Sequence, residues 1–178
     1  LCIALVSSTA APVAAQTDGE RFLVELDSTG DADVSVTFAY DLDSDDETAA
    51  FEALRENTTA QAAVAERFGN RMAAVVDDAS AATDREMSVD GVDIDVRRTG
   101  DVGIVSLSLR WNDFAAVDGD RLTVREPFAS GFEPDRTFTV VAPDGYEFVS
   151  ATPEPPSTDG QSVMWGAGAS LDGFELVA

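Results

Sequence analysis

The stretch VSLSLRW, from Val105 to Trp111, decides how this chain folds. Apolar side chains occupy every second position, with serine or arginine between them. Because successive side chains of a β-strand point to opposite faces, this alternation predicts a strand with one buried and one exposed face. It is the clearest strand pattern in the sequence, and the other elements can be placed outward from it.

A second strand pattern lies just before this one. Its apolar positions are interrupted once, by Asp90-Gly91, and they are Met87, Val89, Val92, Ile94 and Val96. A glycine inside such a pattern predicts a bulge or tight turn. The turn residues Arg98 to Asp101 then connect the two strands. A similar pair of alternating segments, at 22–26 and 34–40, is joined by Ser28 to Asp31, so we predict a hairpin on each side of the intervening segment.

The segment between the hairpins has helical spacing. Ser44 to Glu47 reads as a capping box. Apolar or small residues then recur at spacings built from steps of three and four: Phe51, Leu54, Ala65, Phe68, Met72, Val75 and Ala79. An unbroken helix over 46–82 would be about 55 Å long, against a domain diameter of roughly 40 Å. Thr58 and Gln61 offer a second capping box, so we predict a kinked helix or an αα-hairpin that covers one face of the sheet.

The last third of the chain alternates short apolar segments with turn residues. Strands are predicted at 122–124, 137–141, 146–149 and 162–165, and the residues from Leu171 to Ala178 resemble an unfinished strand. The fold class is therefore α+β, with antiparallel hairpins flanking the helices and a β-rich, sandwich-like half after them. We expect an α+β lobe over 16–116 and a β-rich lobe over 117–178 that is truncated at its C-terminus.

The charge of the chain indicates a salty solvent. All 11 basic residues are arginine, 22 of the 34 acids are aspartate, and the net charge is −23. The repulsion among these charges acts over a screening length of about 10 Å at 0.1 M salt. At 1 M salt that length falls to about 3 Å, so the repulsion is much weaker. The same charge argues against nucleic acid or anionic lipid as partners. With no histidine, the commonest general base and metal ligand is missing.

The first 15 residues, LCIALVSSTAAPVAA, are apolar or small and uncharged. They resemble the end of a signal peptide, cleaved after Ala15, and are too short to span a membrane. A buried N-terminal strand is the alternative. Removal of this segment would take with it Cys2, the single cysteine, and leave a mature chain without disulfides.

One acidic segment has the spacing of a calcium loop. Asp41, Asp43, Asp45 and Glu52 fall at loop positions 1, 3, 5 and 12. Position 6, where the sharp turn needs glycine, is Asp46. The alternative interpretation is helix capping together with a hydrated acidic surface.

Asn57-Thr58-Thr59 is an N-glycosylation sequon, and an exported chain passes the compartment where such glycans are added. Its position at the expected helix break would expose it. The alternative is that it only caps the second helix.

Other candidate residues favour structural interpretations. Trp111 and Trp165 could stack on a sugar, but each continues a strand pattern and is expected in the core. Arg97 and Arg98 could hold an anion, but a charge balance with nearby Asp93 and Asp95 is the stronger interpretation. Without histidine, lysine or a mature cysteine, we expect no enzymatic activity.

From the Phe51 helix through VSLSLRWNDFA (Val105–Ala115) to RTFTVVAPDGYEFVSATPEPP (Arg136–Pro156), the sequence resembles a family of uncharacterised extracellular domains of halophilic archaea. The resemblance covers most of residues 20–178. It implies a signal peptide, an ectodomain and a C-terminal transmembrane anchor, in some members with a cytoplasmic helix-turn-helix domain. It implies no catalytic residues.

These observations support three functional hypotheses. The first is a non-enzymatic, salt-adapted ectodomain of a membrane-anchored surface or sensor protein, exposed at the cell surface. The second is a structural or adhesive envelope module that binds neighbouring proteins or glycans through exposed strands and the proline-rich segment. The third is an exported hydrolase that uses paired carboxylates.

Overall fold

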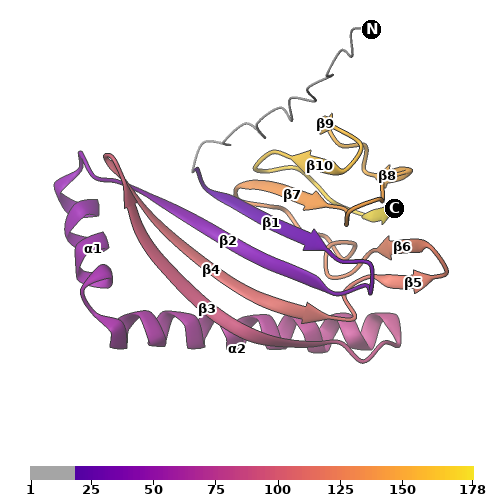
Figure 1. Ribbon diagram of the computed structural model, residues 1–178, viewed down its shortest axis with the longest axis horizontal. Helices are drawn as coiled ribbons and strands as arrows, with labels where there is room; N and C mark the ends of the chain where they lie inside the picture. Colours follow the sequence, from indigo (N-terminus) through magenta and orange to yellow (C-terminus); the bar gives the residue numbers. More distant parts are fainter. Residues whose placement is uncertain (1–18) are drawn as a thin grey trace, which may run out of the picture.

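The strand predicted from Val105 to Trp111 is β4 (Val102–Asn112). It lies inside a seven-stranded sheet with the order β3-β4-β2-β1-β7-β10-β9 (Figure 1). The computed structural model describes residues 19–178. The predicted signal peptide over 1–15 lies outside the described residues. The α+β fold class, with a β-rich second half, is confirmed.

Two antiparallel hairpins form one side of this sheet, as predicted. β1 (Arg21–Leu26) pairs with β2 (Ala32–Asp41), and β3 (Ser88–Thr99) pairs with β4. β2 and β4 join the hairpins, so that Val34 lies opposite both Val24 and Leu109. The predicted bulge in β3 is confirmed by the register shift between Asp90 and Asp93.

The two halves of the chain are joined by a parallel pair that the sequence analysis did not predict. β1 runs parallel to β7 (Thr137–Val141), with Val24 opposite Val140. β10 (Ser162–Trp165) and β9 (Ser157–Thr158) then extend the sheet. Strands from both sides of residue 116 therefore belong to one sheet.

A second sheet of four strands has the order β5-β6-β11-β8. Its strands are β5 (Ala116–Asp118), β6 (Arg121–Val124), β8 (Ser150–Thr152) and β11 (Glu175–Val177). The predicted strand over 146–149 is wrong. The Phe148 amide donates to the Gly160 carbonyl and the Val149 amide to the Val177 carbonyl, so this segment divides its bonds between two elements. The strand begins instead at Ser150, directly after the predicted segment ends.

The helices break at the predicted place, into α1 (Asp45–Arg55) and α2 (Thr58–Thr83). Ser44 caps α1 by accepting from the Glu47 amide at 3.5 Å. The reciprocal half of the predicted capping box is wrong, because the Glu47 carboxylate accepts from the Asp41 amide at 2.7 Å instead. The amide of Ser44 donates to the Asp41 carbonyl, so it needs no bond from Glu47.

The second helix is capped one residue earlier than predicted. Asn57, not Thr58, is the N-cap, and its side-chain oxygen accepts from the Ala60 amide at 3.0 Å. Gln61 donates instead to the carbonyls of Leu54 and Arg55, at 3.0 and 3.1 Å. The Leu54 carbonyl also accepts from the Asn57 amide at 3.2 Å. Because α1 ends at these carbonyls, Gln61 ties the end of one helix to the start of the next.

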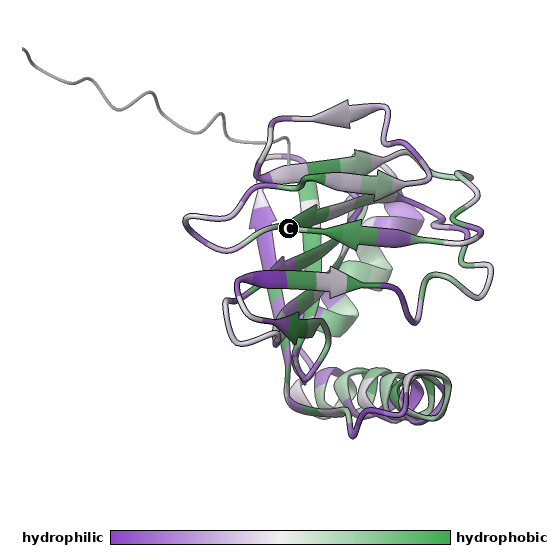
Figure 2. Ribbon diagram, turned by 90° about the vertical axis from the view of Figure 1, so that its right-hand side faces the viewer, coloured by the Kyte–Doolittle hydropathy of each residue, from purple (hydrophilic) through white to green (hydrophobic). Residues whose placement is uncertain are grey.

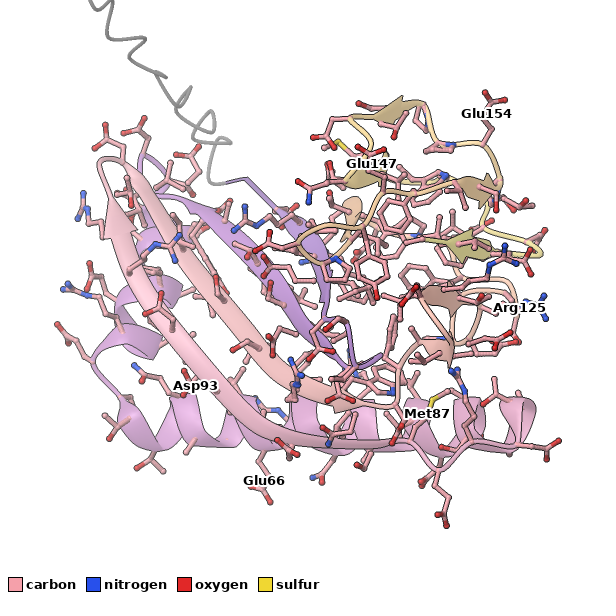
Figure 3. All side chains as sticks on the ribbon, turned by 45° about the vertical axis from the view of Figure 1, so that its right-hand side comes forward. Glu66, Met87, Asp93, Arg125, Glu147 and Glu154 are labelled. Atoms are coloured by element: carbon pink, nitrogen blue, oxygen red, sulfur yellow. The ribbon has the colours of Figure 1, made fainter. Side chains whose placement is uncertain are left out.

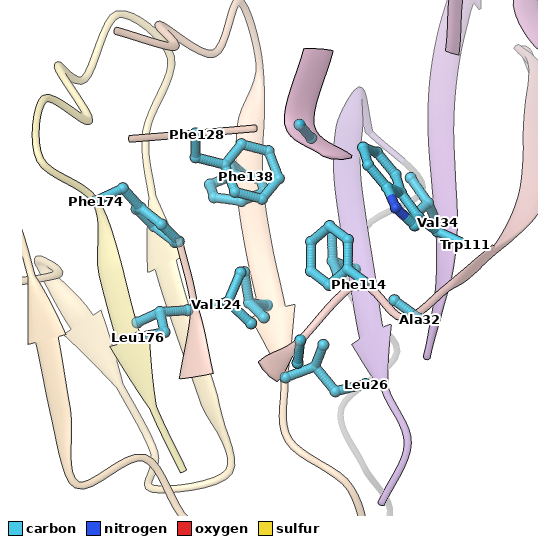
Figure 4. Close-up of a cluster of buried hydrophobic side chains, with 14 of the residues drawn as sticks. Leu26, Ala32, Val34, Trp111, Phe114, Val124, Phe128, Phe138, Phe174 and Leu176 are labelled. Carbon is cyan, nitrogen blue, oxygen red and sulfur yellow. The ribbon is translucent and has the colours of Figure 1, made fainter. Parts of the chain in front are cut away.

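α2 lies along β3 as a layer beside the sheets, and Figure 2 shows that hydrophobic residues concentrate on the strands. The core continues between the two sheets, where aromatic rings meet (Figure 4). Phe128 is central, with ring centroids 4.7 Å from Phe138 and 5.2 Å from Phe174. Trp111 and Trp165 are 1% and 2% exposed, which confirms that they pack in the core. Burying each such side chain contributes about 2 kcal/mol.

α1 is anchored by one side chain packed on a glycine. Phe51 is fully buried, and its ring lies 5.9 Å from that of Tyr40. A Cβ atom built on Gly103 of β4 would lie 2.6 Å from Phe51 Cδ2. Gly103 is therefore needed so that the Phe51 ring can lie against the strand backbone.

Gly103→Ala is expected to lower the free energy of unfolding by about 1–3 kcal/mol, because a fully buried ring must move to admit the methyl group. Urea unfolding in concentrated salt measures this. Gly166→Ala is the matched control, since nothing lies within 4 Å of its added Cβ, and it should change stability by less than about 0.5 kcal/mol. Equal effects of the two substitutions would contradict the assigned role of Gly103.

Candidate functional site

The four acids of the calcium-like segment do not form one cluster. Asp41 ends β2, Asp45 begins α1, and Asp43 lies between them with its amide donating to the Asp41 carboxylate at 3.0 Å. Glu52, about two turns into α1, forms an ion pair with Arg55 at 2.7 Å. Within residues 19–178, no group of three or more acidic, histidine or cysteine side chains is placed to hold a metal ion.

The sequon lies at the corner where α1 ends and α2 begins (Figure 1). Asn57, Thr58 and Thr59 are all exposed. The cap uses only the carbonyl oxygen of the Asn57 side chain. Its amide nitrogen, the atom to which a glycan is attached, makes no hydrogen bond within the described part of the chain. Capping and glycosylation are therefore compatible at this residue.

The paired arginines at the end of β3 are engaged locally. Arg97 forms an ion pair with Asp95 at 3.1 Å, in agreement with the expected charge balance. Arg98 donates to the Gly100 carbonyl at 2.9 Å and lies 4.0 Å from both Glu52 and Asp101. Both side chains are exposed, so these pairs contribute little to stability.

A cluster that the sequence analysis missed surrounds Arg110. This β4 side chain binds Asp27, Asp31 and Asp33, the latter two at 3.1 Å. Burial raises the pKa of Asp27, but hydrogen bonds from Thr29 and Arg110 outweigh it and hold that pKa below its usual value. The hydrogen bond that Arg110 donates to the Asp27 carboxylate raises the pKa of Arg110. The strand pattern did place Arg110 on the polar face of its strand. It did not show that the turn of the first hairpin, which is distant in the sequence, lies beside that side chain.

The Arg110 cluster locks the turn of the first hairpin onto β4. The carboxylate of Asp31 also accepts from the Asp113 amide at 2.9 Å. At the same turn, Gly30 accepts a bond of 2.7 Å from the Ala115 amide. A Cβ atom on Gly30 would lie 2.6 Å from Val117, and its φ of 92° is itself suited to glycine. Together these contacts hold the turn against β4 and the segment that follows it.

The candidate binding site is a cavity of about 570 Å³ at the C-terminal end of α2. It lies where the helix meets β5, β6 and the turn after β6. Its lining residues are Ala82, Thr83, Arg85, Ala116, Thr123, Arg125, Glu126 and Ala129. Figure 3 shows Arg125 projecting outward near this end of α2. Most of the wall is small side chains, so the charged groups are the ones able to recognise a ligand.

Arg85 is the cavity residue whose hydrogen bonding is incomplete. Nη2 donates to the Phe114 carbonyl at 3.1 Å, whereas Nη1 is buried and has no acceptor among residues 19–178. Burial lowers the pKa of Arg85, and the charge of Asp113 partly offsets this. Of the other charged groups of the cavity, Arg125 donates to Glu175 at 2.5 Å, whereas Glu126 accepts from the Ser130 hydroxyl at 3.0 Å and has no cationic partner among residues 19–178.

Comparison with protein families gives one match. A model described as a domain of unknown function, DUF7345, matches residues 23–146, more than half of the chain. The matched region runs from β1 past β7 and includes both helices, the Arg110 cluster and Arg85. No curated protein matches the chain. Neither α1 nor α2 combines the length and the hydropathy that a membrane-spanning helix needs.

Arg110→Met is expected to lower the free energy of unfolding by about 1–2 kcal/mol at neutral pH, since three carboxylates lose their shared donor at a half-exposed site. Because the pKa of Asp27 is lowered in the folded state, this stabilisation is complete above an ordinary aspartate pKa of about 4. This stabilisation is lost as the pH falls through the lowered pKa of Asp27 in the folded protein. Denaturant unfolding of both proteins across this pH range measures the difference.

Arg121→Met is the control, because it removes the same charge from an exposed arginine that has no carboxylate partner within the described residues. Its effect should stay below about 0.5 kcal/mol and vary little with pH. If Arg110→Met matched this control at neutral pH, the cluster would have no stabilising role.

Proposed function

The chain belongs to the DUF7345 family, and we propose that it is a non-enzymatic, salt-adapted extracellular domain of a membrane-anchored surface or sensor protein of a halophilic archaeon. The export and membrane attachment in this proposal are supported by the composition of residues 1–15 and by the resemblance described above. The salt adaptation is supported by the distribution of charge over the folded surface.

One observation carries the proposal: within residues 19–178, no carboxylate side chain is buried, although the chain has 34 acids. Every described acid can therefore bind water and cations at the surface. Mutual repulsion among so many like charges destabilises the compact state unless salt screens it. Such a surface is suited to a concentrated salt solution outside the cell, where the domain would remain folded and soluble.

A second candidate function is a structural or adhesive envelope module. It is favoured by the open edge of the four-stranded sheet, where β8 is the terminal strand. Val149, just before β8, is 74% exposed, and proline residues 153, 155 and 156 follow the strand. An exposed strand edge with an apolar neighbour can pair with a strand of another protein. Cross-linking of the native protein on whole cells would distinguish an envelope partner from a freely exposed sensor domain.

Transfer from about 3 M to about 50 mM NaCl is expected to lower the melting temperature markedly, because the screening length grows from a few ångströms to more than 10 Å. Thermal unfolding followed by circular dichroism measures this. The triple variant Asp118→Asn, Asp120→Asn and Asp144→Asn removes three exposed charges, and should retain a higher melting temperature than the wild type at low salt. A wild-type melting temperature that does not depend on salt would overturn the proposed adaptation.

We expect a glycan on Asn57 in protein purified from its native host, because the sequon is exposed and its amide nitrogen is free. Mass spectrometry of the peptide containing Asn57 detects the added mass. Thr59→Ala should abolish the addition. Asn57→Asp should also abolish it while retaining an oxygen that caps α2, so its melting temperature reports the cap separately. An unmodified wild-type peptide from exported protein would refute this expectation.

A further inference from the structure

We propose that the cavity beside Arg85 binds the carboxylate group of a small organic acid with a short apolar stem. The site is formed by described residues alone, and it goes beyond the proposed function because it does not depend on where the protein is located. Three features carry the inference: the incomplete bonding of Arg85, the small side chains of the wall, and the balance of charge around the cavity.

Arg85 differs from the exposed arginines that have no carboxylate partner within residues 19–178, and it lines a cavity, unlike Arg21, whose Nε is also buried without an acceptor. Arg67, Arg71 and Arg121 are exposed, so water can satisfy their N–H groups. Arg85 is only partly exposed, and its Nη1 is buried without an acceptor. A buried donor that lacks a partner costs about 1–3 kcal/mol, more when it is charged. An oxygen supplied by a ligand would remove that cost after a small rotation of the guanidinium group toward the cavity.

The geometry of the guanidinium group favours a carboxylate over a halide ion. Nη2 already donates to the Phe114 carbonyl at 3.1 Å, which fixes the orientation of the Arg85 side chain. A planar carboxylate matches the planar N–H groups of arginine and can accept from two of them at once. Chloride, which would be abundant in the proposed environment, offers a single centre and cannot use this geometry.

The walls select a short apolar stem. Ala82, Ala116 and Ala129 present methyl groups, and they leave the volume of about 570 Å³ that larger side chains would fill. Such a wall can bury the methylene groups of a bound acid, at about 0.8 kcal/mol for each. The hydroxyl group of Thr123 also lines the cavity and offers a polar contact beside the headgroup.

The charge around the cavity favours a ligand with one negative charge. Glu126 lines the site, and the charge of Arg125 is already balanced by Glu175. Arg85 is the other cation of the cavity, and Asp113 is close enough to act on its charge. A phosphate dianion would bring two negative charges next to Glu126, inside a chain with a net charge of −23. A monocarboxylate adds the least negative charge among anions that can accept from Arg85.

The test is isothermal titration of the purified protein with butyrate, in about 3 M NaCl at constant ionic strength, so that general salt effects are held fixed. Butanol and inorganic phosphate serve as comparison ligands, while chloride is present at about 3 M in every titration. We expect saturable binding of butyrate in roughly the millimolar range, as suits so small a ligand. No saturable binding of the two comparison ligands is expected.

Arg85→Gln should weaken butyrate binding about tenfold or more, since it removes a charged donor pair. Arg121→Gln is the matched control and should bind like the wild type. Ala116→Phe fills the cavity while Arg85 stays in place, so it should also abolish binding; circular dichroism verifies that each variant is folded. The proposal is overturned if butyrate fails to bind, if phosphate binds equally well, or if folded Arg85→Gln retains the affinity of the wild type.

Discussion

The parallel ladder between β1 and β7 is the interaction on which the rest of the structure depends. It joins strands that lie more than a hundred residues apart in the sequence, and it places the C-terminal strands in the same sheet as the two N-terminal hairpins. Phe138 of β7 then contacts Phe128 and stacks on Trp165, at centroid distances of 4.7 and 5.7 Å. Without this ladder the second sheet would have no apolar face to cover.

The few arginines have different roles in this acidic chain. There are only 11 cations for 34 acids, and several of the arginines hold parts of the fold together. Arg110 ties a turn to β4 through three aspartates. Arg136 covers the Phe38 ring at 4.3 Å and donates to the Thr37 carbonyl at 3.1 Å. Arg85 has no comparable set of partners, which is why its cavity is the most informative position for ligand recognition.

Local patterns predicted much of the fold because their causes are local. The alternation from Val105 to Trp111, the bulge at Gly91 and the break between the helices all depend on residues close together in the chain. The capping details were less predictable. Asn57 and Thr58 can both accept from helix amides, and the sequence does not show which of them the backbone directs toward the orphan groups. The strand predicted over 146–149 failed because apolar alternation does not reveal whether one neighbouring strand is available for pairing.

The candidate site was less predictable than the fold. In the sequence, Arg85 is an ordinary polar residue after a helix, and no spacing pattern connects it with Ala116 or Glu126. Only the folding of β5 and β6 brings these residues to the same cavity. The sequence by itself determined the elements, the polar and apolar faces of the strands and the acidic surface, because each of these follows from neighbouring residues or from composition. Only the tertiary structure decided the parallel pairing of β1 with β7, the partners of Arg110 and the incomplete bonding of Arg85, because those depend on contacts between residues distant in the chain.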